Sequence, residues 1–300
     1  MSRKPSAAAA VGATLFAATL WGTSFSVNDY GLRFVEPATF VFLRFALAGV
    51  VTLAAAAIFR VLDARVVRRP WFWGLAAANA AGFLMQYLGQ VHTTPARTAL
   101  FVNTSAFFVA IMERAFVGVR LGAWRVLAVS VGFVGAALLV VRGDFAQLWS
   151  LRLVGDLLTL GAGVAWSVYM VMNREALGES HPLNVTAWTF TLTALLLVPA
   201  LFLDAHPLAV PVVWPVIYAG LVTTALAYGL WSFGLQRISA TASAVLLLAE
   251  ILVASVVSFA IGRESFGPWD YAGAALLVAA VAIMSLVGAR EQGEDAPAHA

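Results

Sequence analysis

Long apolar runs, separated by short stretches that contain charges, glycine and proline, fill almost the whole of this 300-residue chain. A transmembrane helix needs about 20 mainly apolar residues, and ten of the runs have about this length. They predict helices near residues 9–27, 38–59, 71–91, 98–117, 124–141, 155–173, 184–203, 212–235, 239–261 and 270–288. The pattern therefore predicts an all-α integral membrane protein with ten transmembrane helices.

The same pattern occurs twice, at a constant offset of 145 residues. The offset aligns identical residues along the whole of each copy: Trp21 with Trp166, Asn28 with Asn173, Pro37 with Pro182, Pro70 with Pro215, Gly89 with Gly234 and Trp124 with Trp269. Each copy, residues 1–145 and 146–300, contains five predicted spans. Because five is odd, the second copy enters the membrane in the opposite orientation, and such inverted repeats can expose a central site to either side in turn.

Arginine and lysine are divided unevenly between alternate loops. Twelve lie on the side of both termini and five on the other, while Arg44 falls inside a predicted span. Loops rich in Lys and Arg stay in the cytoplasm. We therefore expect a multi-pass protein of the cell membrane, the inner membrane of a bacterium, with both termini in the cytoplasm.

Composition narrows the possible functions. Of all residues 62% are hydrophobic and only 11% are charged, against about a quarter charged in soluble proteins, so the surface must face a lipid bilayer. The scattered basic residues form no stripe for nucleic acid. The sequence has no Cys for thiolate metal sites, and its four His lie in predicted loops or the tail. We expect no cofactor, no metal site and no catalytic pair, and hence no enzyme.

Several short motifs follow one another along nearly the whole chain: Leu20-Trp21-Gly22, Leu43-Arg44-Phe45, Val164-Ala165-Trp166-Ser167-Val168-Tyr169, Ala227-Tyr228-Gly229-Leu230-Trp231 and Leu235-Gln236-Arg237-Ile238-Ser239-Ala240-Thr241. Their order, spacing and duplication resemble the drug/metabolite transporter (DMT) superfamily, EamA type. The resemblance implies two EamA-type repeats and a ten-helix transporter with cytoplasmic termini. Similar bacterial proteins export amino acids, aromatic ones among them, and related metabolites.

The third predicted helix has polar residues on one face. Asn79, Gly82, Gln86 and Gln90 recur at spacings of three and four, which place them on one side of a helix. The repeat offset places Asn79, Phe83 and Gln86 on Thr224, Tyr228 and Trp231 of the eighth predicted helix. The two stripes either line a shared substrate cavity or bond neighbouring helices together.

Tryptophan and asparagine side chains add further candidates. Trp21 and Trp166 lie in matching stripes of the first and sixth predicted helices. Such stripes usually pack helices together, and the alternative is that the two rings line the cavity. Asn103 begins the polar run Asn103-Thr104-Ser105 of the fourth predicted helix. Because three consecutive helical residues point in three directions, they cannot all line one cavity, and Asn103 is the one that we favour.

Two charged residues fall inside predicted spans. Glu250 lies well inside the ninth, where an ionisable group is costly unless it is protonated, paired or hydrated. It either binds a substrate amine, carries a proton that couples export to the proton gradient, or is paired structurally. Arg44 either faces a substrate carboxylate or, as the favoured interpretation, reaches back to the lipid headgroups. Glu113, beside Arg114 near a span end, is expected to be an interfacial charge with a local partner.

These observations predict a secondary transporter that exports a small metabolite, an amino acid with an apolar or aromatic side chain, by alternating access through a cavity between the repeats. Its partners would be this small-molecule substrate, the lipid bilayer and, if transport is coupled, the proton. Two alternatives stay open. One is transport of another solute class, such as a nucleotide sugar, a drug or a lipid, and the other is a membrane protein that interacts with a partner and transports nothing.

Overall fold

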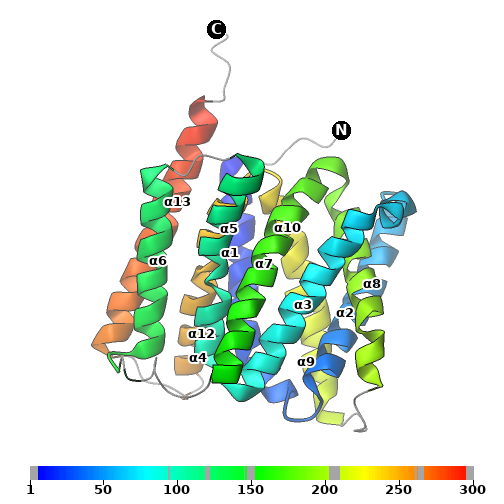
Figure 1. Cartoon of the computed structure of the whole chain (residues 1–300), viewed down its shortest axis with the longest axis horizontal. Coiled ribbons are helices and arrows are strands. Elements are labelled where there is room, and N and C mark those ends of the chain that lie inside the picture. The colour runs from blue at the N-terminus through cyan, green and yellow to red at the C-terminus, as the bar shows by residue number, and fades with distance from the viewer. Residues whose placement is uncertain are drawn as a thin grey trace.

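The computed structural model describes residues 6–93, 95–118, 122–144, 146, 153–202, 210–260, 262 and 267–294. Within these ranges helices form a bundle, and the start of α1 and the end of α13 lie at the same end of it (Figure 1). The first half contains α1 (Ala7–Gly31), α2 (Pro37–Ile58), η1 (Ala64–Arg68), α3 (Pro70–His92), α4 (Pro95–Val102), α5 (Ser105–Met112), η2 (Glu113–Val117) and α6 (Ala123–Val141). The second half contains α7 (Leu153–Glu179), α8 (Pro182–Leu201), η4 (Val210–Val212), α9 (Val213–Ile217), η5 (Tyr218–Leu226), α10 (Ala227–Leu235), α11 (Ala240–Leu247), α12 (Ala249–Ala260) and α13 (Pro268–Glu294).

These helices confirm the predicted fold class. In the described part of the chain, eight helical segments are long and apolar enough to cross a membrane, and Ala123–Leu139 of α6 forms a shorter apolar helix. α3 is less apolar because it carries the amide side chains of Asn79, Gln86 and Gln90, and all three are buried inside the bundle. With α3, the described part of the chain contains ten helical segments at the predicted positions.

Proline marks the start of many of these helices. It is the first residue of α2, α3, α4, α8 and α13. The first N–H groups of a helix have no helical acceptor, so proline loses no hydrogen bond there, and its fixed φ is already helical. α1 instead follows Ser6, whose Oγ accepts a hydrogen bond from the N–H of Ala9 at 3.3 Å. The chain can therefore turn within a few residues and re-enter the bundle.

Helices of one repeat pack mainly against helices of the other. α3 packs along α7, and α1 packs along α10 and α12. α2 packs along α8, and α6 lies beside α13 at one edge of the bundle (Figure 1). The offset of 145 residues relates α1 to α7 and α3 to α10, so the contacts of α3 with α7 and of α10 with α1 are equivalent. The two repeats therefore share one large interface.

Two glycines allow the closest approach of these helices. A β-carbon added at Gly89 of α3 would lie 2.6 Å from Cγ2 of Thr159 in α7, and one added at Gly234 of α10 would overlap Oγ1 of Thr14 in α1. Neither position can take a larger residue without a shift of its neighbour, as is common where small residues bring membrane helices together. The repeat offset relates the two contacts.

The fourth and ninth segments are each interrupted near the middle. The break between α4 and α5 falls at residues 103–104, and the break between α11 and α12 falls at Leu248. The predicted spans 98–117 and 239–261 are therefore present, but each consists of two helices instead of one. The repeat offset places Asn103 on Leu248, so both repeats are interrupted at the same position.

Each interruption is a tight turn of the backbone. The N–H of Thr104 bonds the carbonyl of Phe101 at 3.2 Å, and the N–H of Leu248 bonds the carbonyl of Val245 at 3.1 Å. Both bonds reach three residues back, whereas an α-helix reaches four. Irregular backbone at membrane depth is tolerated where it lines a cavity or is buried in protein, and paired discontinuous helices often mark a transporter's binding site. The two breaks therefore indicate that a candidate binding site lies at the centre of the bundle.

Glu113 joins the repeats at the end of the bundle that holds the start of α1. Its carboxylate is only 1% exposed and accepts hydrogen bonds from the backbone N–H groups of Ala240 and Thr241, both at 2.8 Å. These N–H groups belong to the first turn of α11, which lacks helical acceptors and favours a negative charge. The expectation of an interfacial charge with a local partner is therefore wrong, because Glu113 is buried and binds the opposite repeat.

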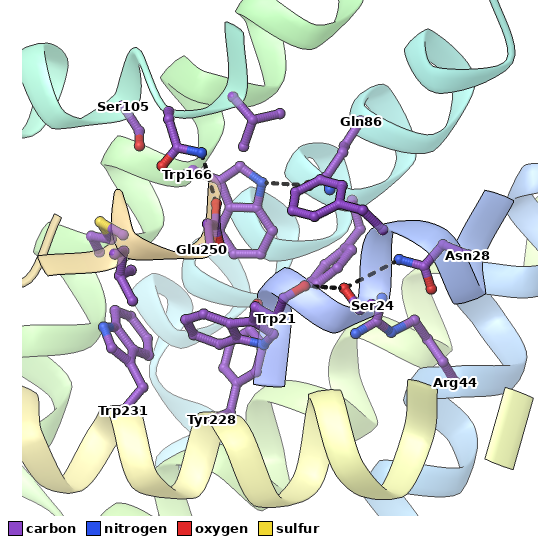
Figure 2. Close-up of a pocket in the computed structure, with 16 residues that line it drawn as sticks. Trp21, Ser24, Asn28, Arg44, Gln86, Ser105, Trp166, Tyr228, Trp231 and Glu250 are labelled. Atoms are coloured by element: carbon purple, nitrogen blue, oxygen red, sulfur yellow. Dashed lines mark hydrogen bonds between the residues drawn. The ribbon is translucent and has the colours of Figure 1, made fainter. Parts of the chain in front are cut away.

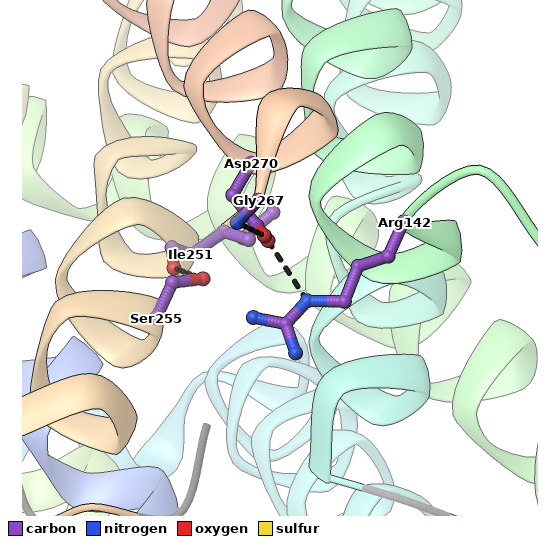
Figure 3. A network of polar contacts seen from close by, with 5 residues as sticks. All are labelled: Arg142, Ile251, Ser255, Gly267 and Asp270. Carbon is purple, nitrogen blue, oxygen red and sulfur yellow. Dashed lines mark hydrogen bonds and ion pairs between the residues drawn. The ribbon is translucent and has the colours of Figure 1, made fainter. Parts of the chain in front are cut away.

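An ion pair joins the repeats at the other end (Figure 3). Nε of Arg142, which follows α6, donates to Oδ1 of Asp270 in α13 at 2.8 Å. The second carboxylate oxygen of Asp270 accepts the N–H of Gly267 at 2.7 Å and so caps the start of α13. This contact fixes the ends of the two neighbouring helices relative to each other.

Candidate functional site

The centre of the bundle contains a cavity between the two repeats. Its wall consists of residues from α1, α2, α3, α7, α10 and the two interrupted segments. Asn103 and Ser105 reach it from the α4–α5 break, and Leu247 and Glu250 reach it from the α11–α12 break. The cavity therefore lies where the equivalent interruptions of the two repeats meet.

Nine of the eleven site residues predicted from the sequence lie on this wall (Figure 2). They are Trp21, Arg44, Phe83, Gln86 and Asn103 of the first repeat and Trp166, Tyr228, Trp231 and Glu250 of the second. The offset of 145 residues relates three pairs of them: Trp21 with Trp166, Phe83 with Tyr228, and Gln86 with Trp231. Each repeat therefore contributes residues from equivalent positions to the wall.

Asn79 and Thr224 lie outside the wall. Asn79 is buried between α3 and α8, where its Nδ2 donates to Oγ1 of Thr193 at 3.0 Å. This contact bonds two helices, as polar side chains in membranes often do. Thr224 lies behind the wall and accepts hydrogen bonds from Arg44. Of the polar residues on this face of α3, Asn79 therefore bonds two helices together, whereas Gln86 lines the cavity.

Aromatic rings on the wall contact one another edge to face. Trp21 contacts Tyr228 with ring centroids 4.9 Å apart, and Tyr228 contacts Trp231 at 5.7 Å. Phe83 contacts Trp166 at 4.7 Å. Aromatic pairs prefer this geometry, so the rings support each other and present an apolar surface that could cover the apolar part of a ligand.

The two tryptophans of α1 and α7 are each fixed by a hydrogen bond to the other repeat. Nε1 of Trp21 donates to the backbone carbonyl of Thr223 at 2.6 Å. Nε1 of Trp166 donates to Oε1 of Gln86 at 3.2 Å. Their indole N–H groups are therefore satisfied by the protein, and a ligand would meet rings that are already oriented.

Arg44 lies inside the bundle and does not reach the lipid headgroups, so the favoured interpretation of the sequence is wrong. The residue is only 1% exposed. Its Nε and Nη2 donate to Oγ1 of Thr224 at 2.9 and 2.7 Å, Nη2 also donates to Oγ1 of Thr223 at 3.3 Å, and Nη1 donates to the hydroxyl of Tyr87. The guanidinium carbon lies 4.4 Å from the ring centroid of Phe83, a cation–π contact. These contacts hold the cation at the cavity.

Glu250 lies on the opposite side of the cavity from Arg44 (Figure 2). It is 9% exposed, and its Oε1 accepts a hydrogen bond from Nδ2 of Asn103 at 2.7 Å. The same Nδ2 also donates to the backbone carbonyl of Ala99 at 2.8 Å. One hydrogen bond therefore links the interrupted segments of the two repeats at the cavity wall.

Three polar wall residues are absent from the sequence prediction: Ser24, Asn28 and Ser105. The sequence contains a signal for Asn28, because it lies seven residues after Trp21, two turns along the same face of α1. In a continuous helix Ser105 would turn away from Asn103. The α4–α5 break lets both reach the wall, and the sequence shows no signal for this break.

The polar groups of the wall are few and diverse. Arg44 is the only cation and Glu250 the only carboxylate among the residues that line the described cavity, and the others offer amides and hydroxyls. Among the residues that the structure describes, no group of three or more His, Cys, Asp or Glu could bind a metal ion. An apolar wall with a few polar groups is typical of a binding site for a small organic molecule.

Comparisons with known proteins agree with the repeat. The sequence model of the EamA-like transporter family matches the chain twice, over residues 8–141 and 153–286. A crystal structure of another protein has the same fold, with a TM-score of 0.80 and 21% identity, and the similarity covers 95% of this chain and 100% of the other.

Curated relatives are similar over most of their length. The "Uncharacterized transporter YyaM" of Bacillus subtilis (strain 168) is 24% identical, covering 80% of this chain and 82% of the relative. The "Probable terminal-alkyne amino-acid exporter" of Streptantibioticus cattleyicolor is 25% identical, covering 92% and 93%. The "Probable amino-acid metabolite efflux pump" of Salmonella typhimurium is 24% identical, covering 90% and 92%.

Proposed function

Because this chain belongs to the EamA-like transporter family, we propose that it exports a small metabolite, an amino acid with an apolar or aromatic side chain, by alternating access through the central cavity. The observation that carries the proposal is the position of the cavity. Both repeats, residues 1–145 and 146–300, give equivalent residues to its wall, and both are interrupted there. Two inverted halves can reorient about such a site and open it to one side at a time.

The wall supports an amino acid as the substrate. Aromatic rings can cover an apolar side chain, while buried polar groups replace the hydrogen bonds that the substrate loses with water. The names of two relatives refer to an amino acid or its metabolites. The residues proposed to contact the substrate are Trp21, Phe83, Gln86, Asn103, Trp166, Tyr228 and Trp231, with Arg44 and Glu250 as the charged groups.

The loop charges support an orientation with both termini in the cytoplasm of a cell that holds the protein in its inner or plasma membrane. In this orientation Glu113 lies at the cytoplasmic end of the bundle, where it binds the start of α11. This contact would have to break when the cavity opens to the cytoplasm. Glu250 either binds the substrate amine or carries a proton that couples export to the proton gradient.

The two alternative functions, transport of another solute class and binding of a partner without transport, would require different residues on the cavity wall. A nucleotide sugar or another multiply charged anion would need several buried cations, and Arg44 is the only one among the described lining residues. A membrane protein that only binds a partner through its outer surface would have no use for a cavity with polar groups between the two repeats. Transport of an uncharged drug or a lipid is tested by the transport experiment that follows.

Uptake of radiolabelled amino acids into proteoliposomes tests the proposal. We expect saturable uptake of apolar or aromatic amino acids, and none into protein-free liposomes. Tyr228→Ala should raise KM at least about tenfold, because loss of a buried aromatic contact weakens binding by about 1.5–3 kcal/mol. Asn79→Leu is the matched control outside the wall and should leave KM within about twofold of the wild-type value. Flux of another solute class alone would favour the first alternative, and no flux of any solute would favour the second.

A further inference from the structure

The geometry around Arg44 points to a carboxylate-binding subsite, and we infer that it selects ligands that carry a free carboxylate. The inference rests on the proposed function for its role in transport, but it concerns one side of the cavity only. Glu250 does not neutralise the arginine, because the two lie on opposite sides of the cavity (Figure 2). Within the described residues, no carboxylate oxygen lies within 4.0 Å of a guanidinium nitrogen of Arg44.

Arg44 therefore carries a charge that its described protein contacts leave uncompensated. Its hydrogen-bond acceptors are the hydroxyl oxygens of Tyr87, Thr223 and Thr224, which are all neutral. Arginine remains protonated in proteins, and a buried cation is costly unless an anion or water compensates it. Because Arg44 lines the cavity, a ligand in the cavity can bring the missing negative charge.

The hydroxyl groups around Arg44 are held in the orientation that accepts hydrogen bonds. Oγ1 of Thr224 donates its own proton to the carbonyl of Ala219 at 2.7 Å, and Oγ1 of Thr223 donates to the same carbonyl at 3.2 Å. Both threonines lie in the π-helix η5, whose widened turn lets consecutive hydroxyls reach one guanidinium. They position Arg44 without neutralising it.

One donor of Arg44 is left for a ligand. A guanidinium has five N–H groups, and the described acceptors occupy one at Nε, one at Nη1 and two at Nη2. The second N–H of Nη1 is therefore available. The ring of Phe83, 4.4 Å from the guanidinium carbon, covers one face of the cation, so an anion would approach along the remaining edge. A carboxylate is the group that binds an arginine edge most strongly among the parts of an amino acid.

Isothermal titration calorimetry on the purified full-length protein tests the subsite. The probes are two matched pairs of compounds: phenylalanine with phenylalaninamide, and 3-phenylpropionate with 3-phenylpropionamide. We expect the two carboxylates to bind at least about tenfold more tightly than their carboxylate-free counterparts, as is usual for loss of a charge-assisted hydrogen bond. In Arg44→Gln the preference should fall to about threefold or less, whereas Arg44→Lys should retain part of it. If Arg44→Gln does not fold, Thr224→Val serves as the second variant. It removes only a hydroxyl that positions Arg44, and it should also reduce the preference.

The outcomes separate this inference from the proposed function. Equal binding of compounds with and without a carboxylate, or no binding of any of the four to the wild-type protein, would overturn the subsite. An unchanged preference in Arg44→Gln would also overturn it. Carboxylate-selective binding without flux in proteoliposomes would contradict transport and leave the subsite standing. Flux of amino acids without the preference would support transport and remove the subsite.

Discussion

Replacement of Glu250 by Gln is expected to lower amino-acid transport at least about tenfold in proteoliposomes. The amide has nearly the shape of the carboxylate, and its oxygen can still accept the hydrogen bond of Asn103, so the variant removes the charge and little else. A charge-assisted hydrogen bond contributes about 1.5–3 kcal/mol, which corresponds to roughly a tenfold effect or more. Initial rates, measured with and without an imposed pH gradient, give the result.

The form of the defect distinguishes two roles of Glu250. A raised KM with an intact response to the pH gradient means that the carboxylate binds a substrate amine. A lost response to the gradient means that it carries the coupling proton. Ser105→Ala is the matched control, because Ser105 lines the same cavity and occupies the equivalent position of the first repeat. Unchanged rates and pH dependence in a folded Glu250→Gln protein would exclude both roles.

Replacement of Glu113 by Ala is expected to open the cavity to the side of the termini. The carboxylate binds two N–H groups at the start of α11, and loss of a buried charge-assisted contact of this kind costs about 2 kcal/mol or more. The equilibrium should therefore shift at least about tenfold away from the conformation that contains the contact. Since the chain has no cysteine, a single Ser24→Cys reporter in the cavity can be labelled with a membrane-impermeant maleimide.

Labelling of the reporter from the side of the termini should be at least about tenfold faster with Glu113→Ala than without it. Arg114→Ala is the matched control, because Arg114 is the exposed neighbour of Glu113 and should leave the rate within about twofold. Equal rates in all three proteins would mean that the Glu113 contact caps α11 but does not keep this end of the bundle closed.

The fold could be predicted from the sequence because lipid imposes simple demands on it. Helices that cross a membrane need long apolar runs, and the constant offset of 145 residues identified the repeat directly. The sequence could not show the breaks at residues 103–104 and at Leu248. Both lie in stretches without proline, and the tight turns depend on packing between the repeats.

The candidate site could be predicted in part, for reasons that particular residues illustrate. Gln86 and Trp231 follow helical periodicity, which identifies an inward face but not what that face touches. Asn79 shares this periodicity and yet bonds Thr193 between two helices. The position of Arg44 in the bundle depends on Thr223 and Thr224, nearly 180 residues away in the sequence. Contacts between distant helices therefore decided which predicted residues reach the cavity.

Counterflow would show most directly that the cavity works by alternating access. Proteoliposomes are preloaded with unlabelled phenylalanine, and the uptake of radiolabelled phenylalanine from a dilute external solution is followed over time. We expect preloading to accelerate uptake several-fold and to produce a transient accumulation, and we expect Tyr228→Ala to reduce both, because a carrier returns faster when it is loaded. Uptake at the same rate with and without preloading, or no uptake above protein-free liposomes, would contradict alternating-access transport of amino acids by this protein.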